Sequence, residues 1–73
     1  MPLINDAWYT LPDGTLVQVR VPLIGNTMLW TQDGQPAYTY DQGQWMRYAY
    51  NSEADAYEAA PCDLTDADLE PNQ

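Results

Sequence analysis

Apolar and polar side chains alternate along much of residues 1–50, with the period of two that is typical of half-buried β-strands. In the stretch LVQVRV, for example, Val17, Val19 and Val21 fall on one side of an extended chain, whereas Gln18 and Arg20 fall on the other. The segments with this pattern are rich in β-branched and aromatic residues. They predict five strands, near residues 7–11, 16–23, 27–32, 37–40 and 45–50.

Turn sequences separate these segments. PDGT at residues 12–15, GN at 25–26, DGQP at 33–36 and DQGQ at 41–44 contain the residues that tight turns favour. Asp-Gly and Gly-Asn between apolar runs indicate hairpins, because these residues tolerate positive φ. Strands joined by such short turns pair with their sequence neighbours in antiparallel fashion. Residues 1–50 therefore predict a β-meander.

The last third of the chain has a different character. Ser52 can cap a helix, and Asp55, three residues on, makes an approximate capping box. EADAYEAA contains good helix formers, its first acids favour a helix N-terminus, and Pro61 would end the helix. We expect a helix near residues 52–60. The predicted fold class is therefore α+β, a twisted antiparallel meander of four to five strands followed by one short acidic helix and a tail.

These elements fit one small domain over residues 1–61, with residues 62–73 as an acidic tail. Thr65 can start a helical turn in LTDADLEP, anchored by Leu64 or Leu69; the alternative is that the whole tail is disordered. A chain of this size buries about 60% of the surface that its unfolded form exposes. A deep substrate pocket is therefore not expected.

Charge is divided unevenly along the chain. The formal net charge is −9, with eleven acids, two arginines, no lysine and no histidine. Residues 1–50 hold four aspartates and both arginines, a net charge of −4 + 2 = −2, and residues 51–73 hold the other seven acids, a net charge of −7. A nearly neutral body therefore precedes an acidic segment.

Several functions are excluded by what the chain lacks. Without histidine there is no ordinary general base near neutral pH, and without lysine there is no Schiff base or phosphate-loop lysine. Cys62 stands alone among acids that blunt a thiol nucleophile. We expect no enzyme, cofactor or metal site. DLTDADLE has spaced carboxylates like a calcium loop, but it lacks the central glycine and the glutamate at position 12.

The charge also excludes direct nucleic-acid binding, which requires lysine and arginine to neutralise phosphates. No apolar stretch approaches the roughly 20 residues of a membrane helix. MPLINDAWYT lacks the features of a signal peptide, and a single cysteine forms no internal disulfide. We expect a cytoplasmic protein without membrane contact, in the host cell cytoplasm if it is encoded by a phage.

An acidic segment is attracted to basic surfaces, above all those that bind nucleic acid. Carboxylates three or four residues apart on a helix lie about 5–6 Å apart, close to the spacing of phosphates along one DNA strand. The candidate partner-binding acids are Glu53, Asp55, Glu58, Asp63, Asp66, Asp68 and Glu70. They predict a row that mimics a nucleic-acid backbone.

In size, acidity and overall layout, the whole chain resembles small phage-encoded inhibitors of host defence, namely anti-CRISPR proteins of the DNA-mimic type and anti-restriction proteins. No motif carries this resemblance. It implies stoichiometric inhibition of a CRISPR effector complex or another basic nucleic-acid-binding protein, whose DNA path would be blocked.

Three alternatives remain open. The acids are a solvated surface that only aids solubility. The protein is a small phage structural or interaction module, monomeric or homodimeric, that uses an aromatic sheet face containing Tyr38, Tyr40, Tyr48 and Tyr50. It is an immunity or antitoxin protein that neutralises a basic nuclease. The two arginines, Arg20 and Arg47, are expected to pair with carboxylates across strands.

Overall fold

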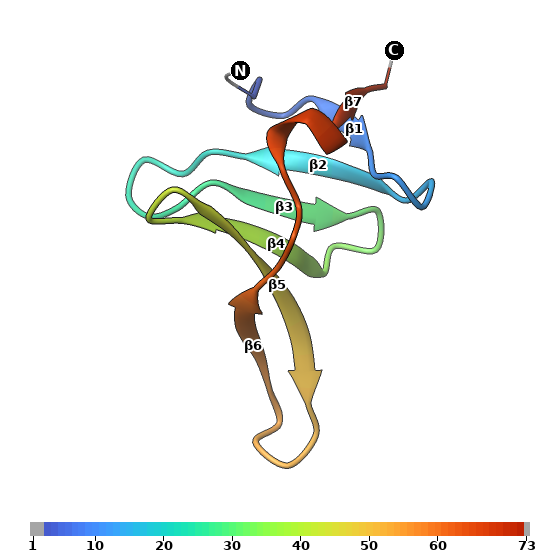
Figure 1. Ribbon diagram of the computed structural model, residues 1–73. Coiled ribbons are helices and arrows are strands. Elements are labelled where there is room, and N and C mark those ends of the chain that lie inside the picture. Colours follow the sequence, from blue (N-terminus) through green and yellow to red (C-terminus); the bar gives the residue numbers. More distant parts are fainter. Residues whose placement is uncertain (1–2, 73) are drawn as a thin grey trace.

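Seven antiparallel strands form a single sheet in the computed structural model, which describes residues 3–72 (Figure 1). The strands are β1 (Trp8–Thr10), β2 (Leu16–Arg20), β3 (Met28–Thr31), β4 (Pro36–Asp41), β5 (Gln44–Asn51), β6 (Ala56–Pro61) and β7 (Glu70–Pro71). Their order across the sheet is β6-β5-β4-β3-β2-β1-β7. The first six strands are therefore a meander, and the seventh lies at the far edge beside β1.

The five strands predicted from alternation are all present, and their turns use the residues that the sequence indicated. Between β4 and β5, Asp41 pairs with Gln44, so that two residues, Gln42 and Gly43, make the turn. Both have positive φ, 52° and 78°, as the tight hairpin turn that matches strand twist requires. Strand β2 ends at Arg20, earlier than predicted, because Pro22 cannot donate to a ladder.

The predicted α+β fold class is wrong, because no helix forms at residues 52–60 and the structure is all-sheet. The described residues contain one short 3₁₀ turn, η1 (Asp66–Asp68), and no α-helix. Ala56–Pro61 instead pairs with β5 at six successive positions. Asp55 has a left-handed φ of 51°, which no α-helix accommodates. A nine-residue helix is marginal alone, and strand pairing outweighs its local propensity.

The segment after β6 crosses one face of the sheet to reach the opposite edge (Figure 1). We call residues 62–69 the strap and the face that they cross the strap face. The strap packs Cys62, Leu64 and Leu69 against the core. Beyond it, β7 pairs with β1, where Tyr9 lies opposite Pro71. The segment predicted as an acidic tail is therefore part of the folded domain from residue 62 to residue 72; residue 73 lies outside the described residues.

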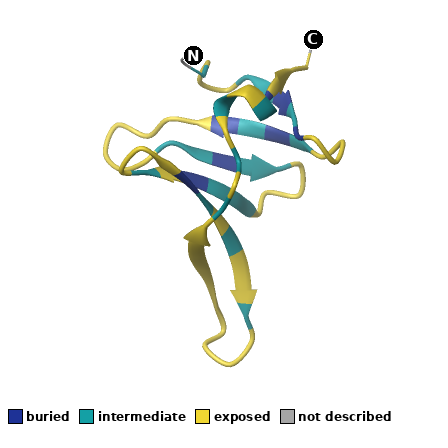
Figure 2. Cartoon of the chain, in the orientation of Figure 1, coloured by how far each residue is buried: buried dark blue, intermediate teal, exposed yellow. Residues whose placement is uncertain are grey.

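The hydrophobic core lies between the sheet and the strap (Figure 2). Val17 and Val19 are fully buried there, as their alternation predicted, whereas Val21 lies beyond the end of β2 and is exposed. The buried set is Tyr9, Leu11, Val17, Val19, Leu29, Trp45 and Leu69. Leu69 is 2% exposed, so the strap supplies a core side chain to a sheet that would otherwise leave this face open.

The β5–β6 hairpin extends beyond the rest of the sheet (Figure 1). Strand β4 pairs with β5 only as far as Arg47, so residues 48–51 pair with β6 alone. Every residue of β6 is exposed (Figure 2). Over residues 3–72, no helix has the length and apolar character needed to cross a membrane.

Candidate acidic binding surface

The seven predicted partner-binding acids fall into two groups in the structure. Glu53, Asp55 and Glu58 lie on the β5–β6 hairpin, and Asp63, Asp66, Asp68 and Glu70 lie on the strap and β7. No helix arranges them in a row, so the helical spacing used to predict a phosphate-like line does not apply. Their arrangement depends on the hairpin and on the path of the strap.

Side-chain hydrogen bonds organise the end of the hairpin. Asn51 Oδ1 accepts hydrogen bonds from the backbone amides of Glu53 (3.0 Å) and Ala54 (3.4 Å), which fixes the turn. Asn51 Nδ2 donates to Glu58 Oε1 at 2.9 Å. Glu58 is thereby held along the ribbon, while Glu53 lies in the turn at the hairpin tip and is exposed.

A tyrosine holds the remaining hairpin acid. The hydroxyl of Tyr50 donates a hydrogen bond to Asp55 Oδ1. This bond to a carboxylate favours the protonated phenol, so it raises the pKa of Tyr50 above the ordinary value of 10.0. The ring of Tyr50 also meets that of Tyr57 edge to face, with centroids 5.5 Å apart. The hairpin is therefore ordered by its own side chains although it buries little.

Two of the strap acids hold the strap in place. Trp45 Nε1 donates to Asp66 Oδ1 at 2.8 Å, which satisfies the indole of a side chain that is 3% exposed. Asp68 Oδ2 accepts from the backbone amide of Thr65 (2.9 Å) and from its hydroxyl (3.2 Å). Thr65 thus starts the helical turn that the sequence indicated, and Asp66 and Asp68 are half-buried.

Cys62 also holds the strap, whereas the other two acids of this group are exposed. The thiol of Cys62 donates to the carbonyl of Trp45 at 3.3 Å and packs against the core. Asp63 and Glu70 are exposed. Of the four acids in this group, Asp66 and Asp68 are bonded within the fold, and Asp63 and Glu70 are exposed.

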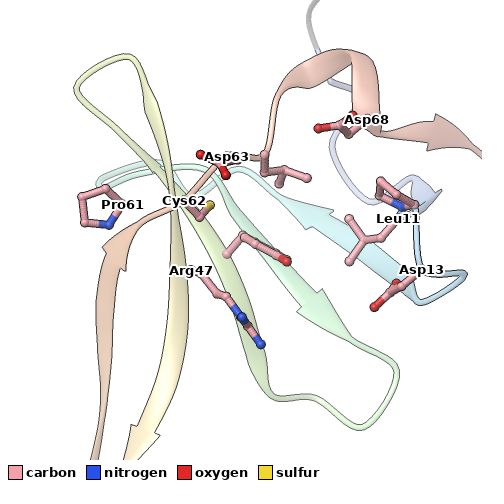
Figure 3. Close-up of a pocket in the computed structure, with 10 residues that line it drawn as sticks. Leu11, Asp13, Arg47, Pro61, Cys62, Asp63 and Asp68 are labelled. Carbon is pink, nitrogen blue, oxygen red and sulfur yellow. The ribbon is translucent and has the colours of Figure 1, made fainter.

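A cleft of about 510 Å³ lies beneath the strap (Figure 3). Its lining contains Arg47 from β5, together with the three aspartates Asp13, Asp63 and Asp68. Within residues 3–72, Arg47 has no carboxylate oxygen within 4.0 Å, whereas Arg20 pairs with Asp6 at 3.6 Å. Of the two arginines, only Arg20 pairs with a carboxylate within the described residues, and Asp6 lies in the segment before β1, not on a neighbouring strand as predicted.

Two groups in the cleft have shifted pKa values. The backbone amide of Thr15 donates to Asp13 Oδ1 at 2.9 Å, and this bond is the largest cause that lowers the pKa of Asp13; Arg47 adds a smaller attraction. Burial raises the pKa of Tyr38, against the opposing effect of Arg47. These surroundings therefore favour the ionised form of Asp13 and the neutral form of Tyr38.

Strand register places a further acid on the same side of the molecule. Ala49 lies opposite Glu58, and Arg47 lies opposite Ala60. Residues two apart on a strand share a face, so Glu58 lies on the same face of the sheet as Arg47 in the cleft beneath the strap. The acids on the strap face are Asp13, Glu58, Asp63, Asp66 and Asp68.

Asp13 was not among the predicted site residues. It lies in the β1–β2 turn and meets the strap only because the chain returns across the sheet fifty residues later. No local pattern signals that contact.

The tyrosines predicted as an aromatic surface are divided between the two faces. Tyr38 lies opposite Arg47 and Tyr40 opposite Trp45, so both are on the strap face. Tyr48 and Tyr50 alternate with Arg47 along β5 and point the other way. Tyr57, which lies opposite Tyr50, joins them and was missed. Tyr50 and Tyr57 are 54% and 41% exposed, so the larger aromatic surface is on the hairpin.

No cluster of three or more histidine, cysteine, aspartate or glutamate side chains suited to a metal ion occurs in residues 3–72. Comparison with protein-family models, with curated proteins and with solved structures finds no significant match. Charge and geometry are therefore the basis for a proposed function.

Proposed function

We propose that this protein is a stoichiometric inhibitor that docks its strap face on a basic nucleic-acid-binding protein and keeps DNA from that surface. The observation that carries the proposal is the collection of five acids on the strap face, while Arg47, the cation on that side, lies in the cleft beneath the strap. Such a surface attracts a basic groove over a Debye length and repels nucleic acid.

The hydrogen bonds on this face support the same proposal. Asp66 and Asp68 are fixed by Trp45 and Thr65, and Glu58 is fixed by Asn51. A carboxylate that is already held loses little conformational freedom when a partner binds. Fixed charges at defined positions also discriminate between partners better than a disordered acidic tail does.

Within this class of partner, a CRISPR effector complex or another defence nuclease is the proposed target. This narrower proposal depends only on the general resemblance in size and charge described above. An immunity or antitoxin protein that neutralises a basic nuclease would use the same surface, and identifying the captured partner distinguishes the two.

The experiment measures how the purified partner, captured from host extract and identified, binds labelled duplex DNA as this protein is added. The test variant is Glu58→Gln with Asp63→Asn, because neither carboxylate is bonded to the core. Two charge changes in this surface are expected to weaken inhibition about tenfold or more. The matched control is Asp33→Asn with Asp41→Asn, which makes the same charge change in the β3–β4 turn and at the end of β4.

The dependence of inhibition on salt concentration is a second test of the same proposal. Inhibition is expected to weaken steeply between ~50 and ~500 mM salt, as charge-driven contacts do. Equal inhibition by the test variant and the wild type, together with no salt dependence, would refute docking by the strap face.

A second candidate is an interaction module that uses the hairpin aromatics. It is favoured by Tyr50 and Tyr57, whose paired rings are exposed on the side away from the strap. Replacing both with serine would abolish partner binding in that case, while the charge variants would leave it unchanged.

A further inference from the structure

Within residues 3–72, one long edge of the sheet has no neighbouring strand. Strand β6 stands at the end of the strand order and pairs with β5 on its other side. The opposite edge is β7, which has two residues and contains Pro71. A long exposed edge presents unpaired backbone groups that pair readily with another chain. Strand β6 is six residues long and every residue of it is exposed, so it is the longest unpaired strand edge among residues 3–72.

The backbone groups that face outward from β6 follow from its pairing. The amide of Cys62 donates to the carbonyl of Trp45 at 3.3 Å, so residues 45 and 62 form a hydrogen-bonded pair. Antiparallel ladders alternate between hydrogen-bonded and non-hydrogen-bonded pairs. Residues 56, 58 and 60 therefore direct their backbone groups toward β5.

The intervening residues direct theirs outward. Tyr57 and Ala59 each present an N–H and a C=O at the free edge, and Pro61 presents a carbonyl alone. The side chains on this strand are small apart from Tyr57 and Glu58, so a neighbouring strand meets little steric hindrance. The free edge thus offers two donors and three acceptors, in the alternating order that an added strand requires.

We infer that β6 is the docking edge for an extended, basic segment of the protein partner, which adds to the sheet as an eighth strand. This inference rests on the proposed function for the charge of the partner and specifies how that partner is held. Main-chain hydrogen bonds to Tyr57 and Ala59 supply the register. Lysine or arginine side chains of the added strand lie on the strap face beside Glu58, and Asp55 and Glu53 extend the same attraction toward the hairpin tip.

Charge selects a basic segment over a second copy of this chain. Two β6 strands paired with each other would bring Glu58 of both copies together between molecules that each carry a net charge of −9. Like charges across neighbouring strands oppose pairing. A strand edge with a central glutamate and no lysine therefore opposes pairing with a second copy of this chain and favours pairing with a cationic strand.

The probe for the experiment is a short peptide in which lysine and valine alternate. Its control has the same side chains but is N-methylated on every second residue, which removes the donors on one edge and leaves the charge unchanged. Binding and amide hydrogen exchange are measured with wild-type protein and with Ala59→Pro. Proline at position 59 removes an outward N–H and leaves the pairing with β5 intact. Ala59→Val, which keeps the N–H, is the matched control.

The unmodified peptide is expected to slow exchange at the amides of Tyr57 and Ala59 by at least tenfold. Binding is expected to weaken at least tenfold with the N-methylated peptide and with Ala59→Pro, but not with Ala59→Val. Comparison of the two peptides on wild-type protein does not depend on the folding of any variant.

Equal binding of both peptides would overturn the edge inference and leave charge docking intact. Protection at Tyr48 and Tyr50 would overturn it as well, because the added strand would then lie on the other side of the ribbon. Self-association that Ala59→Pro abolishes would show a second copy as the occupant and would also refute it. If the strap-face charge variants bind the unmodified peptide as tightly as wild type, the proposed function itself fails.

Discussion

Replacing Leu69 with alanine tests whether the strap is a structural element of the core. Leu69 is 2% exposed and lies between η1 and β7, so its side chain anchors the end of the strap. Removing three buried carbon atoms loses their transfer free energy and leaves a cavity that the small sheet fills only in part. Leu→Ala changes at such sites cost about 2–5 kcal/mol; we expect about 2–3 kcal/mol here because the strap is a single exposed segment that relaxes inward.

That loss is large for a domain of this size. Stability of roughly 0.05–0.15 kcal/mol per residue gives about 4–11 kcal/mol for the whole chain. Chemical denaturation followed by tryptophan fluorescence measures the change in the free energy of unfolding. Leu23→Ala is the matched control, because Leu23 is fully exposed in the β2–β3 loop and the same substitution is expected to cost less than about 0.5 kcal/mol.

If Leu69→Ala and Leu23→Ala shift the free energy of unfolding equally, the strap does not contribute to the core. The C-terminal segment would then be an acidic tail after all, and the strap face would not exist as an ordered surface. A selective loss with Leu69→Ala supports the crossing path that brings Asp13 and Asp68 to one cleft.

Two further predictions concern hydrogen bonds of the acids. Asp66→Ala leaves the indole N–H of buried Trp45 without this acceptor. The substitution is expected to lower the free energy of unfolding by about 1–3 kcal/mol and to shift tryptophan emission. An unchanged denaturation curve would contradict a stabilising role for the bond between Trp45 and Asp66. Tyr50 is expected to titrate above pH 10.0 in an NMR titration, and Asp55→Asn is expected to return its pKa toward that value. Because the pKa is raised in the folded state, the contact stabilises the hairpin fully below pH 10.0, and that contribution disappears as the pH rises through the raised pKa. A Tyr50 pKa that does not respond to Asp55→Asn would contradict the contact.

The meander is predictable because its signals are local. Val17 and Val19 alternate with polar neighbours, and Gly43 follows the turn residue Gln42 at a position that needs positive φ. Such information lies within a few residues of each strand, so a single sequence suffices to find the strands and their antiparallel order.

The C-terminal third is not predictable in the same way. EADAYEAA has the composition of a helix, but Asn51 fixes a turn and Ala56–Pro61 completes a ladder with β5. A helix there would leave that edge of β5 unpaired, so tertiary pairing decides the outcome.

The candidate acidic surface was likewise predictable only in part from the sequence. The acids of residues 51–73 were visible by composition, whereas the contribution of Asp13 and the division of the tyrosines depend on the crossing strap and on strand register. A single sequence contains no local signal for contacts between segments that are fifty residues apart.

The most direct test of the central proposal is hydrogen exchange on this protein in complex with the identified partner. Docking through the strap face predicts slower exchange across residues 62–69, together with loss of DNA from the partner. Slower exchange confined to the opposite face, around Trp8 and Trp30, with DNA still bound to the partner, would contradict it.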